Sequence, residues 1–370
     1  MMKVMTNSAE VRRLLGQCFF IGFDGLELPP SISKFIQENT IGGVTLFANN
    51  YESPAQTAEL INSIQALKAP HDPPLVIAID HEGGKVQRFK KPFTRFPEAR
   101  TIAEENSPKL IFECAQIMGK ELRAVGVNVN YAPVADINTN PSNPIIGRRA
   151  FGETEEQVSK MVTAFVRGLI TSGIQPVVKH FPGHGDTSQD SHFRLPKVKA
   201  SLDMLLKREL APFLKAFKSH CDLVMTAHII VESVEPKLPA TLSKKILQGI
   251  LRDQLHYSGL IISDDMEMRA ITDHFGEIEA PLLALASGVD ILLYHTEPFE
   301  TRVFENMLSK LTAQEGKEAL ESLRVSSQKL NEFKKKNFLP YKPIYIPEIE
   351  AQIGTPEHLA FVKKFETVQA

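Results

Sequence analysis

IQPVVKHFPGHGDTSQDSH, residues 174–192, is the stretch that decides how the rest of the chain is interpreted. It begins with an apolar run, residues 174–178, whose β-branched side chains predict a short strand. Three histidines, two aspartates and a lysine follow within residues 179–192. Surface turns use Asn, Ser, Gly and Pro far more than imidazoles, so an ordinary polar loop is the weaker interpretation. The stretch predicts a buried strand that ends in a functional loop.

Other apolar runs share the character of this strand, and longer amphipathic segments separate them. The predicted strands are Cys18–Phe23, Gly43–Phe47, Leu75–Ile79, Val127–Val134, Gln175–His180, Leu223–Ala227, Leu260–Ser263 and Val289–Leu293. They are continuously apolar, as expected of parallel strands that are buried on both faces. Helices are predicted to begin after Ser53, Ser107 and Thr154, and to occupy residues 201–218 and 243–255. This alternation predicts an α/β fold with a single (β/α)8 TIM-type barrel; a doubly wound sheet is the alternative.

The composition changes after Leu339, so we assign the barrel to residues 1–339 and a C-terminal tail to residues 340–370. Prolines punctuate the tail at positions 340, 343, 347 and 356, and a short helix is predicted near residues 357–366. Apolar side chains predict that the tail packs on the barrel surface instead of trailing from it: Tyr341, Ile344, Tyr345 and Ile346.

Charge and cysteine content limit the partners and the location. The 370 residues include 42 Lys and Arg against 44 Asp and Glu, with no long basic stretch. We therefore expect a monomer that binds a small molecule, with no nucleic-acid partner and no membrane partner. The segment Met1 to Leu15 lacks a signal-like apolar core. Cys18, Cys114 and Cys221 lie far apart among apolar residues, which predicts reduced thiols and a cytoplasmic location.

Polar residues that follow the predicted strands mark where a site would lie. They are Asp80-His81-Glu82, Asp136, Lys179-His180, His228 and Asp264-Asp265. Active sites of such barrels lie at the C-terminal ends of the strands, where the βα loops converge. The carboxylate of Asp264 could act there as a nucleophile, a general base or a metal ligand. Capping of the next helix is the alternative, although Asp265 suits that role better.

Further residues could form an acid/base pair or bind a polyol. Asp190 and His192 are two apart, so in an extended segment the carboxylate can orient the imidazole and stabilise its charged form. A pair of loop residues hydrogen-bonded for structure is the alternative. Glu82 and Asp186 are the alternative acids. Asp80 and Arg88 combine an acceptor with a guanidinium donor, which suits hydroxyl groups, and a structural ion pair is nearly as good an explanation. Arg149 adds a fixed cation or else belongs to a solvated turn.

Four motifs together resemble family-3 glycoside hydrolases. They are KHFPGHGDTSQDSHFRLP at 179–196, IDHEGGKVQRF at 79–89, GRRAFG at 147–152 and IISDDMEM at 261–268. Within that family the chain is similar to bacterial β-N-acetylhexosaminidases of the peptidoglycan-recycling type, from residue 18 to about residue 293. The departures are His81 and Lys85, where relatives often have Gln and Arg, and the tail after Leu339.

The resemblance implies a retaining, exo-acting β-N-acetylglucosaminidase that needs no metal or other cofactor. It would remove terminal N-acetylglucosamine from peptidoglycan-derived muropeptides through a covalent glycosyl-enzyme intermediate. Carried over by motif, Asp264 would be the nucleophile and His192 the acid/base, paired with Asp190. The implied sugar-binding residues are Asp80, Arg88, Arg149, Lys179 and His180.

Other functions stay open at this point. Another family-3 β-glycosidase would use the same motifs on a different sugar, and a catalytically silent protein would only bind sugar. A metal-dependent barrel hydrolase would use ligands among His180, His184, His192 and Asp264, but the first strand lacks the paired histidines usual in such barrels. The sequence has no Trp, which favours a short single-sugar pocket over a long polysaccharide groove.

Overall fold

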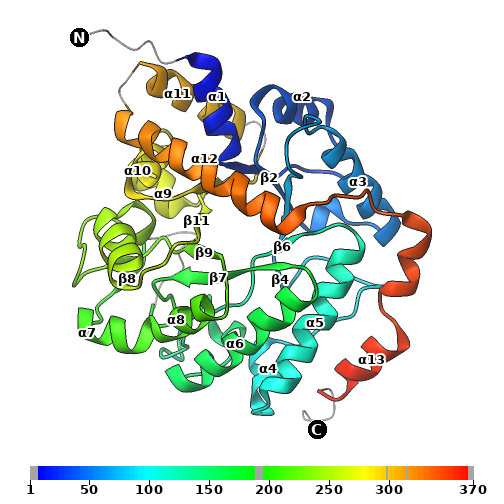
Figure 1. Cartoon of the computed structure of the whole chain (residues 1–370). Helices are drawn as coiled ribbons and strands as arrows, with labels where there is room; N and C mark the ends of the chain where they lie inside the picture. The colour runs from blue at the N-terminus through cyan, green and yellow to red at the C-terminus, as the bar shows by residue number, and fades with distance from the viewer. Residues whose placement is uncertain (1–6, 188–194, 297–298, 314–315, 366–370) are drawn as a thin grey trace.

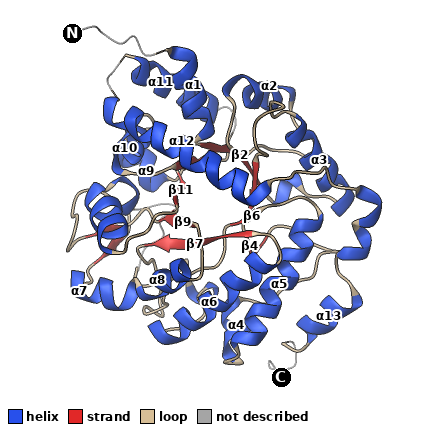
Figure 2. Cartoon of the chain, viewed as in Figure 1, coloured by secondary structure: helices blue, strands red, loops and turns tan. Residues whose placement is uncertain are grey.

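A closed barrel of parallel strands forms the centre of the molecule, with helices around it (Figures 1 and 2). The computed structural model describes residues 7–187, 195–296, 299–313 and 316–365. The barrel strands are β1 (Phe19–Ile21), β2 (Gly43–Leu46), β3 (Val76–Ile79), β6 (Val129–Asn130), β7 (Gln175–Phe181), β9 (Leu223–Thr226), β11 (Leu260–Asp265) and β12 (Ile291–Leu293). Strand β1 closes the barrel by pairing with both β2 and β12. The predicted (β/α)8 barrel is confirmed, and the doubly wound alternative is wrong.

The strands are buried on both faces, which explains their continuously apolar sequences. In β11, Leu260 and Ile262 belong to the cluster of side chains that fills the barrel interior, together with Val177 and Met225. Ile261 lies between them in sequence and belongs to the separate layer that packs against the helices. Since neither face meets water, the charged side chains of these strands lie toward their C-terminal ends, at Lys179 and His180 in β7 and at Asp264 and Asp265 in β11.

Helices occupy the gaps between the strands. They are α1 (Ser8–Gln17), α2 (Pro30–Asn39), α3 (Pro54–Ala66), α4 (Ala99–Glu104), α5 (Pro108–Ala124), α6 (Glu155–Thr171), α7 (Leu202–Met204), α8 (Ala211–Lys218), α9 (Arg269–Phe275), α10 (Glu279–Ser287), α11 (Phe299–Thr312) and α12 (Lys317–Phe338). The predicted starts of α3, α5 and α6 are confirmed. The hydroxyl groups of Ser53, Ser107 and Thr154 each accept the backbone N–H three residues on, which satisfies a donor that the first helical turn leaves free.

Two predicted helices are irregular. Residues 201–218 divide into α7, a π-helical turn at Leu205–Glu209, and α8, and the second segment is π-helical over Lys245–Gln254. Two short strand pairs lie outside the barrel. Strand β4 (His81–Gly83) pairs with β5 (Val86–Gln87), and β8 (Lys197–Val198) pairs with β10 (Ile230–Val231).

Helix α12 closes one end of the barrel. It lies across the strands in Figure 1, and its residues Leu330, Phe333 and Phe338 join the interior cluster. The buried ammonium of Lys334 donates to the backbone oxygen of Gly42, just before β2, at 3.2 Å. This contact identifies the closed end as the one where the strands begin. The opposite end, where they finish, is left for a site.

The tail after Leu339 packs on the outside of the barrel. It includes α13 (Pro356–Lys363), close to the predicted helix, and Ile353, Phe361 and Phe365 are buried in the cluster that also holds the barrel's outer layer. Ile344 and Ile346 are partly buried against that cluster, but Tyr345 is 66% exposed, so the expectation for this side chain is wrong. The backbone is extended at Tyr345, which turns its side chain away from the surface that its two neighbours contact.

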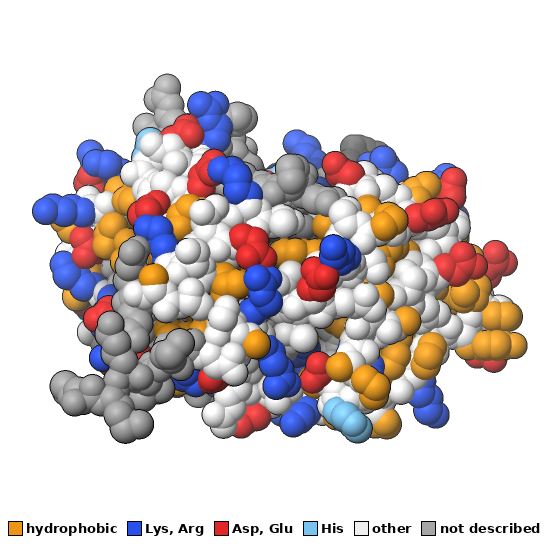
Figure 3. All heavy atoms as spheres, turned by 90° about the horizontal axis from the view of Figure 1, so that it is seen from above, with side chains coloured by type: hydrophobic (Ala, Val, Ile, Leu, Met, Phe, Trp, Pro, Cys, Tyr) orange, Lys and Arg blue, Asp and Glu red, His pale blue; other side chains and the backbone are white. Residues whose placement is uncertain are grey.

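Acidic and basic side chains intermix on the face drawn in Figure 3 and do not gather by sign. None of the described helices combines the length and the apolar character that a membrane span needs. The three cysteines are buried free thiols, as predicted.

Candidate active site

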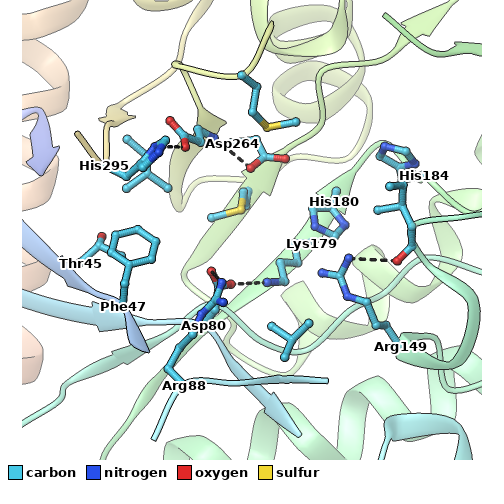
Figure 4. A pocket seen from close by; sticks show the side chains of 16 residues that line it. Thr45, Phe47, Asp80, Arg88, Arg149, Lys179, His180, His184, Asp264 and His295 are labelled. Carbon is cyan, nitrogen blue, oxygen red and sulfur yellow. Dashed lines mark hydrogen bonds and ion pairs between the residues drawn. The ribbon is translucent and has the colours of Figure 1, made fainter. Parts of the chain in front are cut away.

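Alternation along the barrel strands carries polar side chains into the open end. The interior residues Ala78, Val177, Ile262 and Leu293 are each followed two positions later by a polar residue, namely Asp80, Lys179, Asp264 and His295. Side chains two apart in a strand share a face, so the polar groups continue the interior surface. All four line one cavity of about 370 Å³, and the interior residue Met225 is also part of its lining (Figure 4 shows the four polar residues). Such a volume suits one small ligand.

Lys179 is the centre of a buried charge network in this cavity. Its ammonium lies 2.6 Å from a carboxylate oxygen of Asp80 and 2.7 Å from one of Glu82. Arg88 donates to the other oxygen of Asp80 at 3.2 Å. Figure 4 shows Asp80, Arg88 and Lys179 together on one side of the cavity. The structure thus brings together three of the residues that the sequence predicts to bind sugar.

Arg149, a fourth predicted binding residue, is fixed by Glu82. Its Nε donates to one Glu82 oxygen at 2.9 Å and its Nη2 donates to the other at 2.7 Å, which is bidentate geometry. A third donor, Nη1, bonds the backbone oxygen of Ile145 at 3.2 Å. Arg149 lines the cavity with only 22% of its side chain exposed, so the solvated-turn alternative is wrong.

Charge compensation keeps this network ionised. Burial would raise the pKa of Glu82, but the charges of Arg149 and Lys179 outweigh it and hold the pKa well below its ordinary value. The same competition, with Lys179 and Arg88 as the cations, lowers the pKa of Asp80. Burial would lower the pKa of Lys179, but the two carboxylates raise it overall. The two cations therefore favour the carboxylate form of Glu82, which argues against Glu82 as the alternative acid.

Asp264 lies across the cavity from this network, at the end of β11 (Figure 4). One of its oxygens accepts the backbone N–H of Asp265 at 2.9 Å. Burial would raise its pKa, but His228, His180, that N–H group and Lys179 together lower it. A carboxylate that is ionised and faces a cavity can attack an electrophilic carbon or neutralise developing positive charge. The pairing of β11 with β12 shifts register between Ile262 and Asp265, a bulge of the kind that redirects side chains at active sites.

Asp265 is not the helix cap that the sequence suggests. Helix α9 begins at Arg269, with Met268 at its N-cap position and no side-chain cap. The carboxylate of Asp265 instead accepts the backbone N–H of Glu267 within the turn at 3.0 Å and pairs with His295. Since β11 continues to Asp265, the chain turns before the helix starts, and the carboxylate is used in that turn.

Asp136 orients the fifth predicted binding residue, His180. Its buried carboxylate accepts a hydrogen bond from His180 Nδ1 at 2.7 Å and one from the backbone N–H of His184, also at 2.7 Å. His180 and His184 both line the cavity. Burial lowers the pKa of His184 to about 4, so this ring is neutral at physiological pH. Asp136 thereby fixes the first part of the histidine-rich stretch 179–192, from His180 to His184.

His228 supports the backbone that carries Asp264. Its Nε2 donates to the backbone oxygen of Asp265 at 2.9 Å, and its Nδ1 shares a 2.8 Å hydrogen bond with the Thr241 hydroxyl. The ring is buried, and burial lowers its pKa. Because the carbonyl can only accept, the hydrogen of the neutral ring is on Nε2.

His295 extends the site on the side of Asp264. Its Nδ1 contacts the Asp265 carboxylate, and Glu267 accepts the backbone N–H of His295 at 2.7 Å. The hydrogen bond to Asp265 raises the pKa of His295 to about 8. Gly22 makes room for this arrangement, since an added Cβ there would lie 2.7 Å from the Phe47 ring and 3.0 Å from the His295 backbone.

The described ligands of the metal alternative, His180, His184 and Asp264, do not form a metal-binding group with one another, and His192 lies outside the described residues. Within the described residues, the one group of His and carboxylate ligand atoms gathered within 4.8 Å is Asp265, Glu267 and His295. None of His180, His184 and Asp264 belongs to it. Its own atoms already bond one another or backbone N–H groups, so the geometry is that of an ion-pair network.

Asp190 and His192, the pair predicted to be catalytic, lie outside the described residues. The chain leading to it is well anchored, because Asn143 Nδ2 donates to the backbone oxygen of His184 at 2.9 Å and Asn140 Nδ2 to that of Thr187 at 3.0 Å. Asp186, the other alternative acid, is partly exposed and lies 3.4 Å from the Arg208 guanidinium.

Several residues that line the cavity or support its lining were missed or left without a role by the sequence interpretation. Asp136 and His228 were noticed only as strand-end residues, whereas His295, Thr45 and Phe47 were not considered. The same signal could have found His295, because it follows an apolar strand at the spacing seen for Asp264. His81, a departure from the usual motif, is buried among Phe89, Phe93 and Phe96 and faces away from the cavity lining.

Comparison with known proteins identifies the family. Residues 15–336 match the model of the glycosyl hydrolase family 3 N-terminal domain. The β-hexosaminidase of Nitrosomonas eutropha is 39% identical over 264 residues, which cover 70% of this chain and 74% of that protein. The β-hexosaminidase A of Pseudoalteromonas piscicida is 34% identical over 357 residues, 90% of this chain but only 59% of that relative.

A solved structure is similar over nearly the whole chain. The glycoside hydrolase family 3 β-N-acetylglucosaminidase from Paenibacillus sp. str. FPU-7 has a TM-score of 0.87 at 35% identity. The similarity covers 96% of this chain and 68% of that one. The chain therefore belongs to glycosyl hydrolase family 3, as a glycoside hydrolase of its β-N-acetylhexosaminidase group.

Proposed function

We propose that the protein is a retaining, exo-acting β-N-acetylglucosaminidase that removes terminal N-acetylglucosamine from peptidoglycan-derived muropeptides. The observation that carries the proposal is an ionised Asp264 facing a one-sugar cavity whose other side is the Asp80–Lys179–Arg88 network. An attacking carboxylate is one of the two groups that retaining glycosyl transfer requires, and the other is a proton donor at the leaving oxygen; the network supplies the binding of the sugar.

The reaction proceeds in two displacements. In the first, an oxygen of Asp264 attacks the anomeric carbon, the glycosidic bond breaks, and an acid protonates the departing oxygen. In the second, water attacks the anomeric carbon of the glycosyl-enzyme and releases Asp264. The residue that served as the acid now acts as a base and takes a proton from that water. We assign the acid/base role to His192, oriented by Asp190. This assignment is supported by the sequence motif and by the two cations beside Glu82, which favour its carboxylate form and argue against it as the acid.

The charge network binds the non-reducing sugar. Asp80 accepts hydroxyl hydrogen bonds, and Arg88, Lys179 and Arg149 donate them, each fixed by a carboxylate before substrate arrives. Such preorganised donors strengthen the grip on the transition state without further rearrangement. The closed barrel bottom and the small cavity support exo action on a single terminal residue.

The motifs and the cysteines also support a biological setting. We infer that the protein acts as a monomer in the cytoplasm, needs no cofactor, and consists of a barrel at residues 1–339 with a tail at 340–370. The buried reduced cysteines are consistent with a reducing compartment. The motif resemblance to peptidoglycan-recycling enzymes supports muropeptides as substrates.

Turnover of p-nitrophenyl β-N-acetylglucosaminide, compared with the matching glucoside and galactoside, tests the sugar. Selective cleavage of the N-acetylglucosaminide is expected; preference for the glucoside would instead indicate another family-3 β-glycosidase. Proton NMR of the first product tests the mechanism. The β-anomer should appear first, because two displacements retain configuration. Initial release of the α-anomer would exclude the glycosyl-enzyme.

A further inference from the structure

The C-terminal tail contacts the segment that follows Arg88, and Glu121 is the point where they meet. Glu121 lies on α5 and is only 1% exposed. It accepts the backbone N–H of Thr94 at 2.9 Å and the Thr94 hydroxyl at 2.6 Å. From the tail it accepts the backbone N–H of Gly354 at 2.9 Å and Nδ1–H of His358 at 2.7 Å. One buried carboxylate thus joins three separate parts of the chain.

Thr94 passes this connection to the sugar-binding residues. Its backbone oxygen accepts a hydrogen bond from Gln87 Nε2 at 2.9 Å, and Gln87 Oε1 accepts the backbone N–H of Phe96 at 2.9 Å. Gln87 directly precedes Arg88, whose guanidinium contacts Asp80 at 3.2 Å. The path from the tail to the cavity therefore consists of fixed hydrogen bonds within a folded loop.

Apolar packing reinforces the same contact. Phe89, Phe93 and Phe96 of the loop share one buried cluster with the tail residues Ile353 and Phe361. The two backbones also approach closely at Gly354, where φ is +59° and an added Cβ would lie only 2.1 Å from the backbone oxygen of Pro92. The tail is thus pressed against the loop at a position where glycine alone leaves space.

We propose that the tail after Leu339 is a brace for the sugar site, with His358 and Gly354 as positioning residues that act through Glu121 and Thr94 on Arg88. Without the tail, the buried Glu121 carboxylate loses two of its four donors, and such a group is costly to leave under-satisfied. The loop then shifts or loosens, and Arg88 no longer meets the sugar in the geometry that Asp80 requires. The tail lies beyond the residues that match the family model, so this brace is an addition to the matched barrel.

His358→Leu in the full-length chain tests the brace. It removes the N–H donor while keeping an apolar side chain, and kcat/KM for an aryl N-acetylglucosaminide should fall roughly 10-fold, since small displacements of binding groups are costly. His358→Asn, which retains a donor near Nδ1, should recover most of the activity. Leu359→Ala, on the same helix but 42% exposed, is the matched control and should behave as wild type.

A double-mutant comparison separates positioning from general stability. In an Arg88→Ala background, His358→Leu should cause no further loss of kcat/KM, because the residue through which it acts is already gone. If the two losses of kcat/KM instead multiply in the double mutant, the proposal is overturned. If His358→Leu does not fold, Thr94→Val, which removes the hydroxyl that donates to Glu121, replaces it in the same comparison.

The kinetic arm rests on the proposed function, so a second readout does not use activity. Hydrogen exchange at the amides of residues 88–96 should quicken in His358→Leu and stay unchanged in Leu359→Ala. Unchanged exchange in both variants would overturn the brace even in a fully active enzyme. Faster exchange in His358→Leu, with a wild-type protein that leaves N-acetylglucosaminides intact, would keep the brace and remove the proposed function.

Discussion

Arg149 grips Glu82 with two parallel hydrogen bonds, of 2.9 and 2.7 Å, although the two residues are 67 positions apart in the chain. Lys179 contacts the same carboxylate at 2.7 Å. Glu82 is therefore a permanent anion that holds two cations at the wall of the cavity. This arrangement sets Glu82, a structural anion, apart from Asp264, the carboxylate that we propose as the nucleophile.

Replacing Asp264 by Asn should reduce kcat by roughly 10³-fold or more, because neither the glycosyl-enzyme nor the counter-charge can form. Asp265→Asn is the neighbouring control and should cost less, since its carboxylate bonds the Glu267 backbone and His295. Steady-state kinetics with circular dichroism decide the matter. A crippling Asp265→Asn beside a mild Asp264→Asn would show that the nucleophile is misassigned by one residue.

Glu82→Gln should lower kcat/KM by a similar factor for good and poor leaving groups. The loss comes from releasing Arg149 and Lys179, which act on the sugar whatever the aglycone. Aryl glycosides that span a range of leaving-group pKa give the measurement. A loss confined to poor leaving groups would mean that Glu82 donates the proton after all.

His192→Ala should instead cause losses of activity that depend on the leaving group. An acid that protonates the departing oxygen matters most for basic leaving groups, so a natural disaccharide should lose far more activity than an activated aryl glycoside. Asp190→Ala should follow the same pattern, since it removes the partner that stabilises the charged imidazole. Uniform losses in both variants, with an unaltered pH profile, would give this pair a structural role.

His295 should make stability depend on pH. Its folded pKa of about 8, raised by its hydrogen bond to Asp265 and by the charges of Asp265, Glu267 and Asp24, lies above the unfolded value of about 6.5. The stabilisation is therefore fully present below about pH 6.5 and is lost as the pH rises through about 8. Between pH 6 and pH 9, Tm should fall less in His295→Gln than in wild type or in the exposed-site control His274→Gln. Equal falls in all three proteins would contradict this linkage.

Lys334→Met should stabilise the fold. Burial lowers the pKa of Lys334 to about 8, below its unfolded value, so carrying the charge in the folded state costs stability at neutral pH. We expect a gain on the order of 1–3 kcal/mol at pH 7, as for other buried charges replaced by apolar residues. The gain should shrink toward pH 10, where wild-type folding no longer requires the charged form. Urea unfolding at both pH values measures it, and a loss at pH 7 would show that the bond to Gly42 outweighs the desolvation.

The sequence by itself determined the barrel and much of the site. The side chains of β11 alternate between the barrel interior and the layer against the helices, and both surroundings are apolar. The strand sequence is therefore continuously apolar, and its first charged residue, Asp264, must lie at the barrel mouth. The same local rule identifies Asp80 and Lys179, because the information is contained in a few consecutive residues. It could also have identified His295.

The tertiary structure alone decided which charges meet. Glu82 pairs with Arg149 across 67 positions, and Glu121 pairs with His358 across 237 positions. The spacing of apolar residues in the sequence predicts which residues are buried. It does not predict which charged residues are brought together when the barrel closes and the tail packs on it. Burial makes an unpaired charge costly, so closure both creates these pairs and fixes which carboxylates hold the site together and which one remains for chemistry.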